Sequence, residues 1–375
     1  MSPRNKPARV LHVIDSLHLG GAQEVVMNLA TCGDQGAFVH EVATMHGHGV
    51  YWQRIAALGI KLHSLSPHKL VPWYVPSLAA LLARGNFDIL HCHLIASNIV
   101  AKPVGALCRV PVIINHDHTN DSYRARQRVR LALDSLSNRF ATHIIAVSES
   151  CRQFLLTREG VPENKITLVQ NAIDLGRYSP DCGARSDARR SLRLPAGARI
   201  VAGVGRLNPQ KNFSLFVRIA AAVHRTISDA HFLLAGDGPE EELLRRQVEA
   251  AGLSSHFTFT GYVADTRQVY LAADVLLMPS LFEGLPMTLL EAMAMRLPVV
   301  ASALDGIAEV ITDGQDGFLV PDHSEVQFAE RVTSLLEDAG LARTIGKSAA
   351  QTMAARFSVE RMTSQVEAVY KKFLP

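Results

Sequence analysis

Two carboxylates and two cations in the second half of the chain have types and spacings that suit a charged ligand. Glu283 and Glu291 lie in SLFEGLPMTLLEAMA, and Arg206 and Lys211 lie in GVGRLNPQKN. Paired carboxylates can act as general acid and base, as in glycosidases. A guanidinium and an ammonium group both form charge-assisted hydrogen bonds with phosphate. Two solvated surface cations would show the same spacing, so both interpretations of Arg206 and Lys211 stay open.

The helix expected after Pro286 bears on the role of the two carboxylates. Proline is favoured at the first helical position, so we predict a helix that begins at Pro286 and runs through TLLEAMAM. At a rise of about 1.5 Å per residue, Glu291 lies ~7–8 Å along the helix axis, whereas Glu283 precedes the helix. The helix N-terminus can bind a phosphate. This spacing suits a long ligand whose hydroxyls the acids hold, better than two acids flanking one bond.

Short runs rich in valine and isoleucine alternate with stretches of helical periodicity along the whole chain. This alternation predicts βαβ units and parallel sheets. The polar stretch SPDCGARSDARRS (179–191) is the best linker candidate, and the alternation restarts after it. We therefore predict two doubly wound α/β domains, residues 1–180 and 181–356, and a helix at 357–375 that packs back toward the first domain. The expected strands are 9–15, 40–46, 61–66, 89–94, 111–118, 143–148, 166–173, 198–207, 231–238, 257–262, 274–280, 298–304 and 317–322.

The loops that follow these strands are the expected binding elements. Ligands of doubly wound sheets bind beyond the carboxyl ends of the strands, so the cleft between the domains is the predicted site. Gly20 and Gly21 stand where the first strand gives way to a helix, whose free amides attract an anion. A tight connection is the other interpretation of this pair, because neither GxGxxG nor GxxxxGK[ST] is present.

Composition restricts the class of protein. A length of 375 residues with 48% apolar and 19% charged residues is typical of a two-domain soluble protein. A net charge of +3 predicts no general affinity for nucleic acid. Five cysteines without metal-type spacing indicate reduced thiols, hence a cytoplasmic location. No apolar run approaches the ~20 residues of a membrane span, so any membrane contact is expected to be peripheral.

The whole set of motifs resembles glycosyltransferase family 4. It comprises GG (20–21), HD (116–117), NAID (171–174), GRLNPQKN (205–212), AGDGP (235–239), GY (261–262), E-x7-E (283–291) and DGIAEVITDGQDGFLVPD (305–322). Members of this family have the GT-B fold, two Rossmann-like domains with the active site in the cleft between them. They use nucleotide-diphosphate sugars and retain the anomeric configuration. Ala172 departs from the pattern, which commonly has glycine there, and we expect a local change in the backbone.

The resemblance implies a role for each matching residue. Arg206 and Lys211 would neutralise the diphosphate of the donor. Glu291 would bind the ribose hydroxyls, and Glu283 the hydroxyls of the transferred sugar. Backbone contacts to sugar and phosphate would come from Gly284, Leu285, Thr288 and Leu289. The remaining contacts would be His116 to the transferred sugar, Gly20 and Gly21 to the phosphates, and Tyr262 and Val263 to the base.

The histidine pairs HCH (91–93) and HDH (116–118) raise the question of a metal. Residues i and i+2 of a strand share a face, so each pair could chelate an ion. Hydrogen-bonded histidines at strand ends are the alternative, and the chemistry of the family needs no metal. We therefore expect no metal and no other cofactor, and His116 is a stronger site candidate than His93.

The activity that the resemblance implies is that of a retaining glycosyltransferase. The EGLP loop favours a UDP-sugar over a GDP-sugar, and the acceptor would be a glycan or a polyprenyl or other lipid-linked molecule. Such enzymes build bacterial surface polysaccharides or glycolipids at the inner face of the plasma membrane. Two other hypotheses stay open: a nucleotide-sugar epimerase or hydrolase of the same fold, and a non-catalytic protein that binds nucleotide sugars.

The arginine-rich segment 121–140 has two interpretations. Its arginines, from Arg124 to Arg130 and again at Arg139, alternate with valine and leucine. A solvated helix face would have this composition. A basic patch that docks on anionic lipid, or that holds the phosphate of an acceptor, would have it too.

Overall fold

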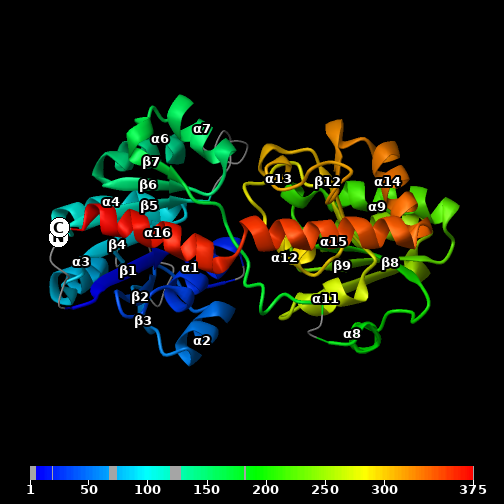
Figure 1. Ribbon diagram of the computed structural model, residues 1–375, viewed down its shortest axis with the longest axis horizontal. Coiled ribbons are helices and arrows are strands. Elements are labelled where there is room, and N and C mark those ends of the chain that lie inside the picture. The colour runs from blue at the N-terminus through cyan, green and yellow to red at the C-terminus, as the bar shows by residue number, and fades with distance from the viewer. Residues whose placement is uncertain (1–5, 19, 67–73, 119–127, 181–182, 375) are drawn as a thin grey trace. The chain divides into compact units, whose positions relative to one another are not determined.

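The computed structural model describes residues 6–18, 20–66, 74–118, 128–180 and 183–374, which form two compact units (Figure 1). One unit comprises Met1–Ala172 and Val359–Pro375, and the other comprises Ile173–Ser358. The division falls earlier than the boundary expected at residue 180. The reason is that the Ile173 amide donates a hydrogen bond to the Phe357 carbonyl (2.9 Å), which ties this part of the chain to the second unit.

The first unit is built on a parallel sheet in the order β3-β2-β1-β4-β5-β6-β7. The order reverses between β1 and β4, which makes this pair the topological switch point. Its elements are β1 (Ala8–Ile14), α1 (Gly21–Cys32), β2 (Phe38–Thr44), α2 (Val50–Ala57), β3 (Lys61–Ser64), α3 (Tyr74–Gly85), β4 (Ile89–His93), α4 (Ile95–Leu107), β5 (Val112–Asp117), α6 (Arg128–Ser137), β6 (His143–Ala146), α7 (Glu149–Thr157), β7 (Ile166–Leu168) and α16 (Val359–Phe373).

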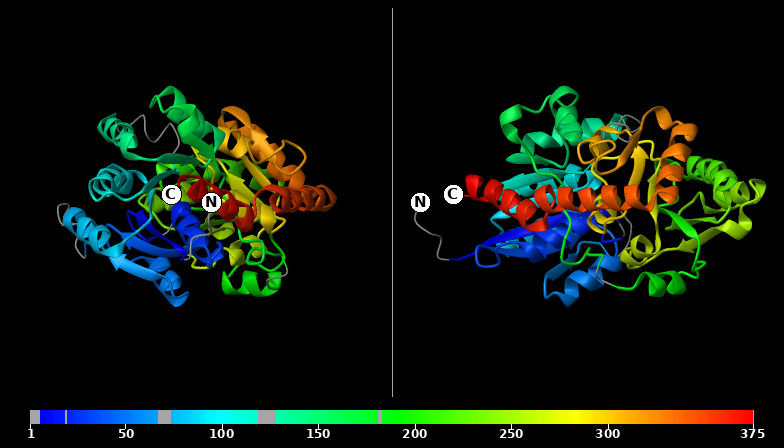
Figure 2. Two further views of the ribbon diagram at one scale, coloured as in Figure 1. Left: turned by 60° about the vertical axis from the view of Figure 1, so that its left-hand side comes forward. Right: turned by 45° about the vertical axis from the view of Figure 1, so that its right-hand side comes forward.

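The two faces of this sheet differ in chemistry. Successive side chains of a strand point to opposite faces, so Leu11 and Val13 of β1 pack with Leu90 of β4 and with α3 and α4. The opposite face carries His12 and His91, which lie in register on β1 and β4. Helix α16 packs against α1 and contacts this second face (Figures 1 and 2). The final helix therefore closes the polar face of the first sheet.

The second unit has a parallel sheet in the order β10-β9-β8-β11-β12-β13, with its switch point between β8 and β11. Its elements are α8 (Arg185–Ser191), β8 (Arg199–Val204), α9 (Phe213–Thr226), β9 (Ala230–Ala235), α10 (Glu241–Ala250), β10 (Phe257–Gly261), α11 (Arg267–Ala272), β11 (Val275–Met278), α12 (Met287–Ala294), β12 (Val299–Ser302), α13 (Asp305–Ala308), β13 (Phe318–Val320), α14 (Glu325–Glu337) and α15 (Ala339–Arg356).

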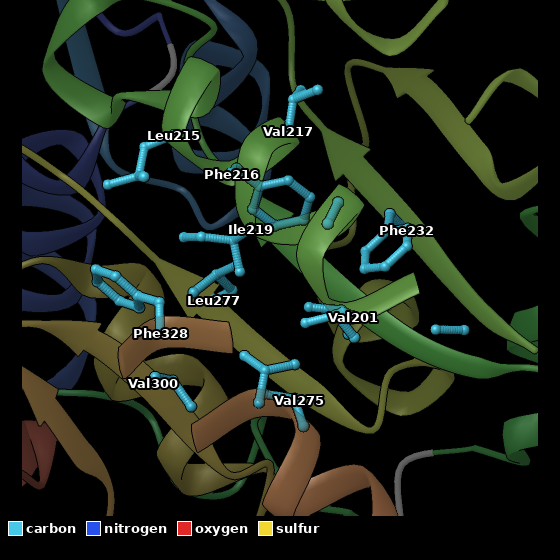
Figure 3. Packing of buried hydrophobic residues seen from close by; sticks show 14 of the residues in the cluster. Val201, Leu215, Phe216, Val217, Ile219, Phe232, Val275, Leu277, Val300 and Phe328 are labelled. Carbon is cyan, nitrogen blue, oxygen red and sulfur yellow. The ribbon is translucent and has the colours of Figure 1, made fainter. Parts of the chain in front are cut away.

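An apolar cluster fixes α9 and α14 on this second sheet (Figure 3). Phe216 and Ile219 of α9 lie one turn apart on the face that meets Val201 and Leu277 of the strands. Phe328 of α14 joins the same cluster. Each side chain is almost completely buried, so the strand ends that carry the loops are held on a rigid support.

Every strand expected from the sequence overlaps a strand of the structure, and the predicted doubly wound α/β class is confirmed. The prediction of a linker at 179–191 is wrong for its second half, which forms α8. Arg189 of α8 is buried and donates hydrogen bonds to the Ala272 carbonyl (3.0 Å) and to Asp274 (3.1 Å). None of the described helices has the length and apolarity needed to cross a bilayer.

Candidate active site

The switch point of the second unit brings together the two loops with the predicted cations and carboxylates. The chain leaves β8 at Val204 and β11 at Met278, and these strands are hydrogen-bonded neighbours. Leu281 donates its amide to the Gln210 carbonyl (2.8 Å), and the Gln210 side chain donates to the Phe282 carbonyl (3.1 Å). The two loops thus form one hydrogen-bonded platform beyond the carboxyl ends of the strands, where ligands of such sheets bind.

Local turn chemistry sets the position of Lys211. Residues Pro209–Lys211 form a 3-10 turn, and the side chain of Asn208 accepts a hydrogen bond from the Lys211 amide (3.3 Å). Asn212 follows in the left-handed region (φ 51°), which asparagine tolerates better than most residues. Gly205 has φ 147°, and a side chain there would meet the Lys211 side chain. The turn therefore directs the lysine back over the end of β8.

Lys211 forms an ion pair with Glu283 across the switch point. The distance from Lys211 Nζ to Glu283 Oε1 is 2.6 Å, and both side chains are mostly buried. The Ser280 hydroxyl donates to the same carboxylate (2.8 Å), and the Gln210 amide approaches it at 3.4 Å. Several donors therefore fix Glu283 in one orientation. The sequence indicated both charges but not that they contact each other.

Close backbone packing holds the loop that follows Glu283. A Cβ atom added at Gly306 would lie 1.4 Å from the Gly284 carbonyl oxygen, so only glycine fits at position 306. Helix α12 begins at Met287, and Pro286 is its N-cap with ψ 127°. The prediction that Pro286 is the first helical residue is therefore wrong by one position, because its backbone is still extended. The N-terminus of α12 follows the glutamate loop directly.

Glu291 is held by a different set of partners. It is buried on α12, and its Oε2 accepts hydrogen bonds from the Tyr270 hydroxyl (2.6 Å) and from Thr266 (3.1 Å). Burial and the neighbouring Glu291 carboxylate raise the pKa of Tyr270 well above its ordinary value, so the phenol stays neutral and donates. Glu283 is held by residues of the loops after β8 and β11, and Glu291 by Tyr270 of α11 and by Thr266 just before that helix. The two acids thus have separate supports.

The other predicted donor-side residues lie around these two groups. Arg206 is exposed and makes no ion pair with any residue that the structure describes. Tyr262 is exposed and Val263 half-buried, directly after Gly261 at the end of β10. Gly284 is half-buried and Leu285 and Leu289 are buried, while the Thr288 hydroxyl is buried and lacks a hydrogen-bond partner in the described part of the chain.

In the first unit, the corresponding switch point carries the predicted Gly20 and Gly21. Both are exposed, and α1 begins at Gly21. Across the switch point, Asp15 accepts a hydrogen bond from the Ser97 amide of α4 (2.7 Å). Burial raises the pKa of Asp15 above its ordinary value. The first loop and the start of α4 are thereby joined, as the loops after β8 and β11 are in the second unit.

His116 is fully buried on β5, one position before Asp117. It lies in a group of six histidines on the polar face of the first sheet, and this group, called here the histidine layer, comprises His12, His40, His91, His93, His116 and His118. Burial lowers the pKa of His116 well below its ordinary value, with a further contribution from His118. Its imidazole is therefore neutral at neutral pH.

The segment from Arg124 to residue 127 lies outside the described residues.

Comparison with known proteins agrees with these two units. A model described as Glycosyltransferase Family 4 matches residues 19–177, and one described as Glycosyl transferases group 1 matches residues 184–352. The chain is a family 4 glycosyltransferase. It is 29% identical over 328 residues to a protein of Bacillus subtilis (strain 168) named "Putative glycosyltransferase EpsF". The match covers 82% of this chain and 81% of EpsF. It is 25% identical over 302 residues, 78% of each chain, to the UDP-Gal:alpha-D-GlcNAc-diphosphoundecaprenol alpha-1,3-galactosyltransferase of Escherichia coli.

Solved structures give the fold of this glycosyltransferase. HepE of Anabaena in complex with UDP-glucose superposes with a TM-score of 0.88 at 21% identity, covering 97% of this chain and 99% of HepE. WaaG, a glycosyltransferase involved in lipopolysaccharide biosynthesis, gives a TM-score of 0.77 at 14% identity, covering 96% of this chain and 99% of WaaG. At these identities the likeness concerns the fold, and the expected GT-B fold is confirmed.

The supporting residues of the site were missed by sequence reasoning. Tyr270 and Thr266 lie more than twenty positions before the glutamate that they hold, and Ser280 is the last residue of the strand expected at 274–280, where no pattern marks it as a partner of Glu283. A signal existed for Tyr270 only, because a tyrosine on a buried helix face needs a hydrogen-bond partner for its hydroxyl.

Proposed function

We propose that this glycosyltransferase moves a sugar from a UDP-sugar to a glycan or lipid-linked acceptor, with retention of the anomeric configuration. The observation that best supports this proposal is the platform at the β8–β11 switch point. There the Lys211–Glu283 ion pair, the exposed Arg206 and the N-terminus of α12 provide cationic and hydroxyl-binding groups together. UDP as the nucleotide is favoured because UDP-Gal appears in the name of the Escherichia coli relative and UDP-glucose is bound in HepE.

The proposed reaction follows from where charge develops. The bond between the anomeric carbon and the phosphate oxygen breaks, and the leaving diphosphate gains negative charge while the sugar becomes cation-like. Arg206, Lys211 and the N-terminus of α12 would stabilise that charge, which is the usual source of the largest catalytic effect. The acceptor hydroxyl attacks from the same face, and its proton passes to the departing phosphate oxygen. No metal is needed in this scheme, because the protein's own cations neutralise the diphosphate.

Glu283 and Glu291 would hold the two ends of the donor. Carboxylates accept hydrogen bonds from sugar hydroxyls, and each of these two already has a fixed orientation. Glu291, held by Tyr270, would bind the ribose diol, and Glu283 would bind hydroxyls of the transferred sugar. His116, neutral because of burial, would take no part as an imidazolium ion.

The decisive experiment combines product analysis with two charge-removing variants. Purified protein is incubated with UDP-, GDP- and ADP-sugars and a lipid-diphosphate glycan acceptor, and the product anomer is determined by NMR. We expect transfer from a UDP-sugar with retention, and Arg206→Met and Lys211→Met should each lower kcat about 10²–10³-fold. Lys347→Met, at an exposed lysine of α15 in the same unit, is the matched control and should retain full activity.

The other outcomes separate the alternatives. Loss of the donor without any acceptor indicates a hydrolase, and a change in the donor sugar's configuration indicates an epimerase. Binding without turnover, seen as a rise in melting temperature with UDP-sugar alone, indicates a non-catalytic binding protein. Near-full activity of a double variant that lacks both Arg206 and Lys211 would refute the role assigned to the two cations.

We also propose that α6 contacts the anionic surface of the inner face of the plasma membrane. Val129, Leu133 and Leu136 are exposed on α6 at 75%, 46% and 54%, and their spacing of four and three residues places them on one helix face. An exposed apolar stripe on a helix whose sequence also contains arginines is typical of an interfacial helix. Replacing these three residues by serine should abolish flotation with vesicles containing phosphatidylglycerol. Val326→Ser, at an apolar residue 66% exposed in the second unit, is the control. Flotation that persists in the triple variant would contradict the proposal.

A further inference from the structure

The register of the first sheet places the whole histidine layer on one face. His12 lies opposite His91, and His93 lies opposite His116, in neighbouring parallel strands. His91 and His93 are two positions apart on β4, so their side chains point the same way. The rings lie close together, with centroids of His91 and His93 only 4.2 Å apart. The buried face of an ordinary parallel sheet is lined by apolar side chains, whereas this face is lined by histidines.

Three ring nitrogens converge between β1 and β4. His12 Nδ1 lies 3.1 Å from His93 Nε2. His91 Nε2 is fully buried and has no hydrogen-bond partner among the described residues. One ligand nitrogen from each of these three histidines lies within 4.8 Å of the other two. Two nitrogens bound to one zinc ion at ~2.0–2.1 Å in tetrahedral geometry are about 3.3 Å apart, close to the observed His12–His93 separation.

The opposite nitrogen of each of these rings is already engaged. His91 Nδ1 lies 2.5 Å from the Tyr370 hydroxyl of α16, and His12 Nε2 lies 2.9 Å from His40 Nδ1. His93 Nδ1 lies 3.2 Å from His118 Nε2. Histidine ligands of metals almost always donate their other N–H group to such a partner, which fixes the tautomer and the orientation of the ring. The three histidines therefore have both the inner nitrogens and the outer partners of a metal site.

Unsatisfied nitrogens mark the same place. Buried polar groups of native proteins nearly always have a hydrogen-bond partner, and each exception calls for an explanation. In this layer, within the described residues, the nitrogens without a partner are His40 Nε2, His91 Nε2, His118 Nδ1 and both nitrogens of His116. His116 lies beside both His91 and His93, with ring centroids 5.2 and 5.3 Å away. An ion bound between β1 and β4 would provide the missing partner of His91 Nε2.

We propose that His12, His91 and His93 bind one divalent transition-metal ion, zinc by preference, through His12 Nδ1, His91 Nε2 and His93 Nε2. His116 lies outside this group of three and belongs to a second group with His93 and His118. Imidazole nitrogens suit zinc, copper, nickel and iron, and three histidines with an open fourth position are a known zinc ligand set. This assignment differs from the expectation from sequence that the HCH and HDH pairs bind no metal. It is independent of the proposed transfer reaction, in which no metal takes part.

The ion would act as a structural cross-link. It would join β1 and β4 at the switch point of the first unit, and Tyr370 would connect it to the final helix. Such an ion stabilises the fold in which its ligands are assembled, because no preformed site exists in the unfolded chain. Removal of metal is therefore expected to lower the melting temperature of the first unit and to loosen α16.

The test begins with the full-length wild-type chain, purified through a tag without histidine from cells grown with added zinc. We expect about one equivalent of zinc per chain by mass spectrometry, and X-ray absorption should show three imidazole ligands and no sulfur ligand. Cobalt(II) added to metal-depleted protein should give the intense visible bands of a tetrahedral site. Less than stoichiometric zinc together with absent cobalt bands would overturn the proposal without the need for any variant.

Variants then locate the site. His12→Gln and His93→Gln should abolish zinc retention against a competing chelator, and circular dichroism will show whether each still folds. Tyr370→Phe keeps the packing but removes the outer partner of His91, and it should weaken zinc binding about 10–100-fold. His143→Gln is the matched control, since His143 lies on the same sheet and bonds to Thr167 (2.8 Å) outside the layer. Equal zinc in Tyr370→Phe and wild type, or zinc lost in His143→Gln alone, would contradict the assignment.

Discussion

Replacing Tyr270 by phenylalanine tests the assignment of Glu291 to the ribose. The Tyr270 hydroxyl donates to Glu291 Oε2 at 2.6 Å in a buried environment, and the Thr266 hydroxyl donates to the same oxygen at the longer distance of 3.1 Å. A hydrogen bond to a charged group contributes roughly 1.5–3 kcal/mol. At 1.36 kcal/mol for each factor of ten, full loss of this bond corresponds to about 10–150-fold in affinity. Because Thr266 still holds the carboxylate, we expect UDP to bind about tenfold more weakly.

Calorimetry with UDP and 2′-deoxy-UDP separates orientation of the carboxylate from general damage. If Glu291 binds the ribose diol, wild-type protein prefers UDP to the deoxy compound, and Tyr270→Phe should reduce that preference as well as the affinity. Tyr51→Phe removes the hydroxyl of a buried tyrosine–glutamate hydrogen bond, that with Glu24 in the first unit, and controls for the loss of a hydroxyl from the core. An unchanged preference for UDP in Tyr270→Phe, at unchanged melting temperature, would refute the reasoning.

Three further predictions concern stability and are measured by urea unfolding. Gly306→Ala places a Cβ atom 1.4 Å from a loop carbonyl and should cost about 1–3 kcal/mol and most activity, whereas Gly197→Ala, with open space around it, should be neutral. Lys102→Met breaks a fully buried ion pair with Asp134 (2.9 Å) and should cost about 3–5 kcal/mol, and adding Asp134→Leu should restore part of the loss; no restoration would show that the lysine acts through packing. Burial, with a contribution from a neighbouring histidine, lowers the pKa of His231 to about 4, so the unfolded chain alone binds a proton between pH 6.5 and 4. The free energy of unfolding is therefore unaffected by this histidine above pH 6.5 and should fall by about 1–2 kcal/mol, allowing for partial solvent screening, as the pH drops to 4. His231→Gln should make the free energy of unfolding less dependent on pH in this range. The same pH dependence in His231→Gln and wild type would assign the acid sensitivity to other groups.

Sequence alone predicted the architecture because the patterns that determine it are local. Buried parallel strands read as short runs of valine, isoleucine and leucine, and helices between them read as amphipathic stretches, as in β8 and α9. The linker error at α8 has the same origin. Arg189 resembles a solvated residue in the sequence, and only its partner Asp274, far along the chain, makes it part of the fold.

The candidate site was predicted in residue types but not in its connections. Lys211 and Glu283 are 72 positions apart, and only the adjacency of β8 and β11 brings them together. The histidine layer shows the same limit on a larger scale. Each HxH pair is visible in the sequence, but the register that aligns His12 with the pair on β4 depends on sheet order, which no local pattern encodes.

The two cations of the platform at the β8–β11 switch point, Arg206 and Lys211, have different surroundings and therefore different expected roles. Arg206 is exposed, so it can attract a diphosphate from a distance and bind it without first leaving another partner. Lys211 is engaged with Glu283, and breaking a buried pair normally leaves a costly unpaired charge. Here the hydroxyl of Ser280 and the amide of Gln210 also reach the carboxylate, so Lys211 can turn toward a phosphate while Glu283 keeps donors. Sugar hydroxyls could then add to the same carboxylate, and the ion pair would couple binding of the diphosphate to binding of the sugar.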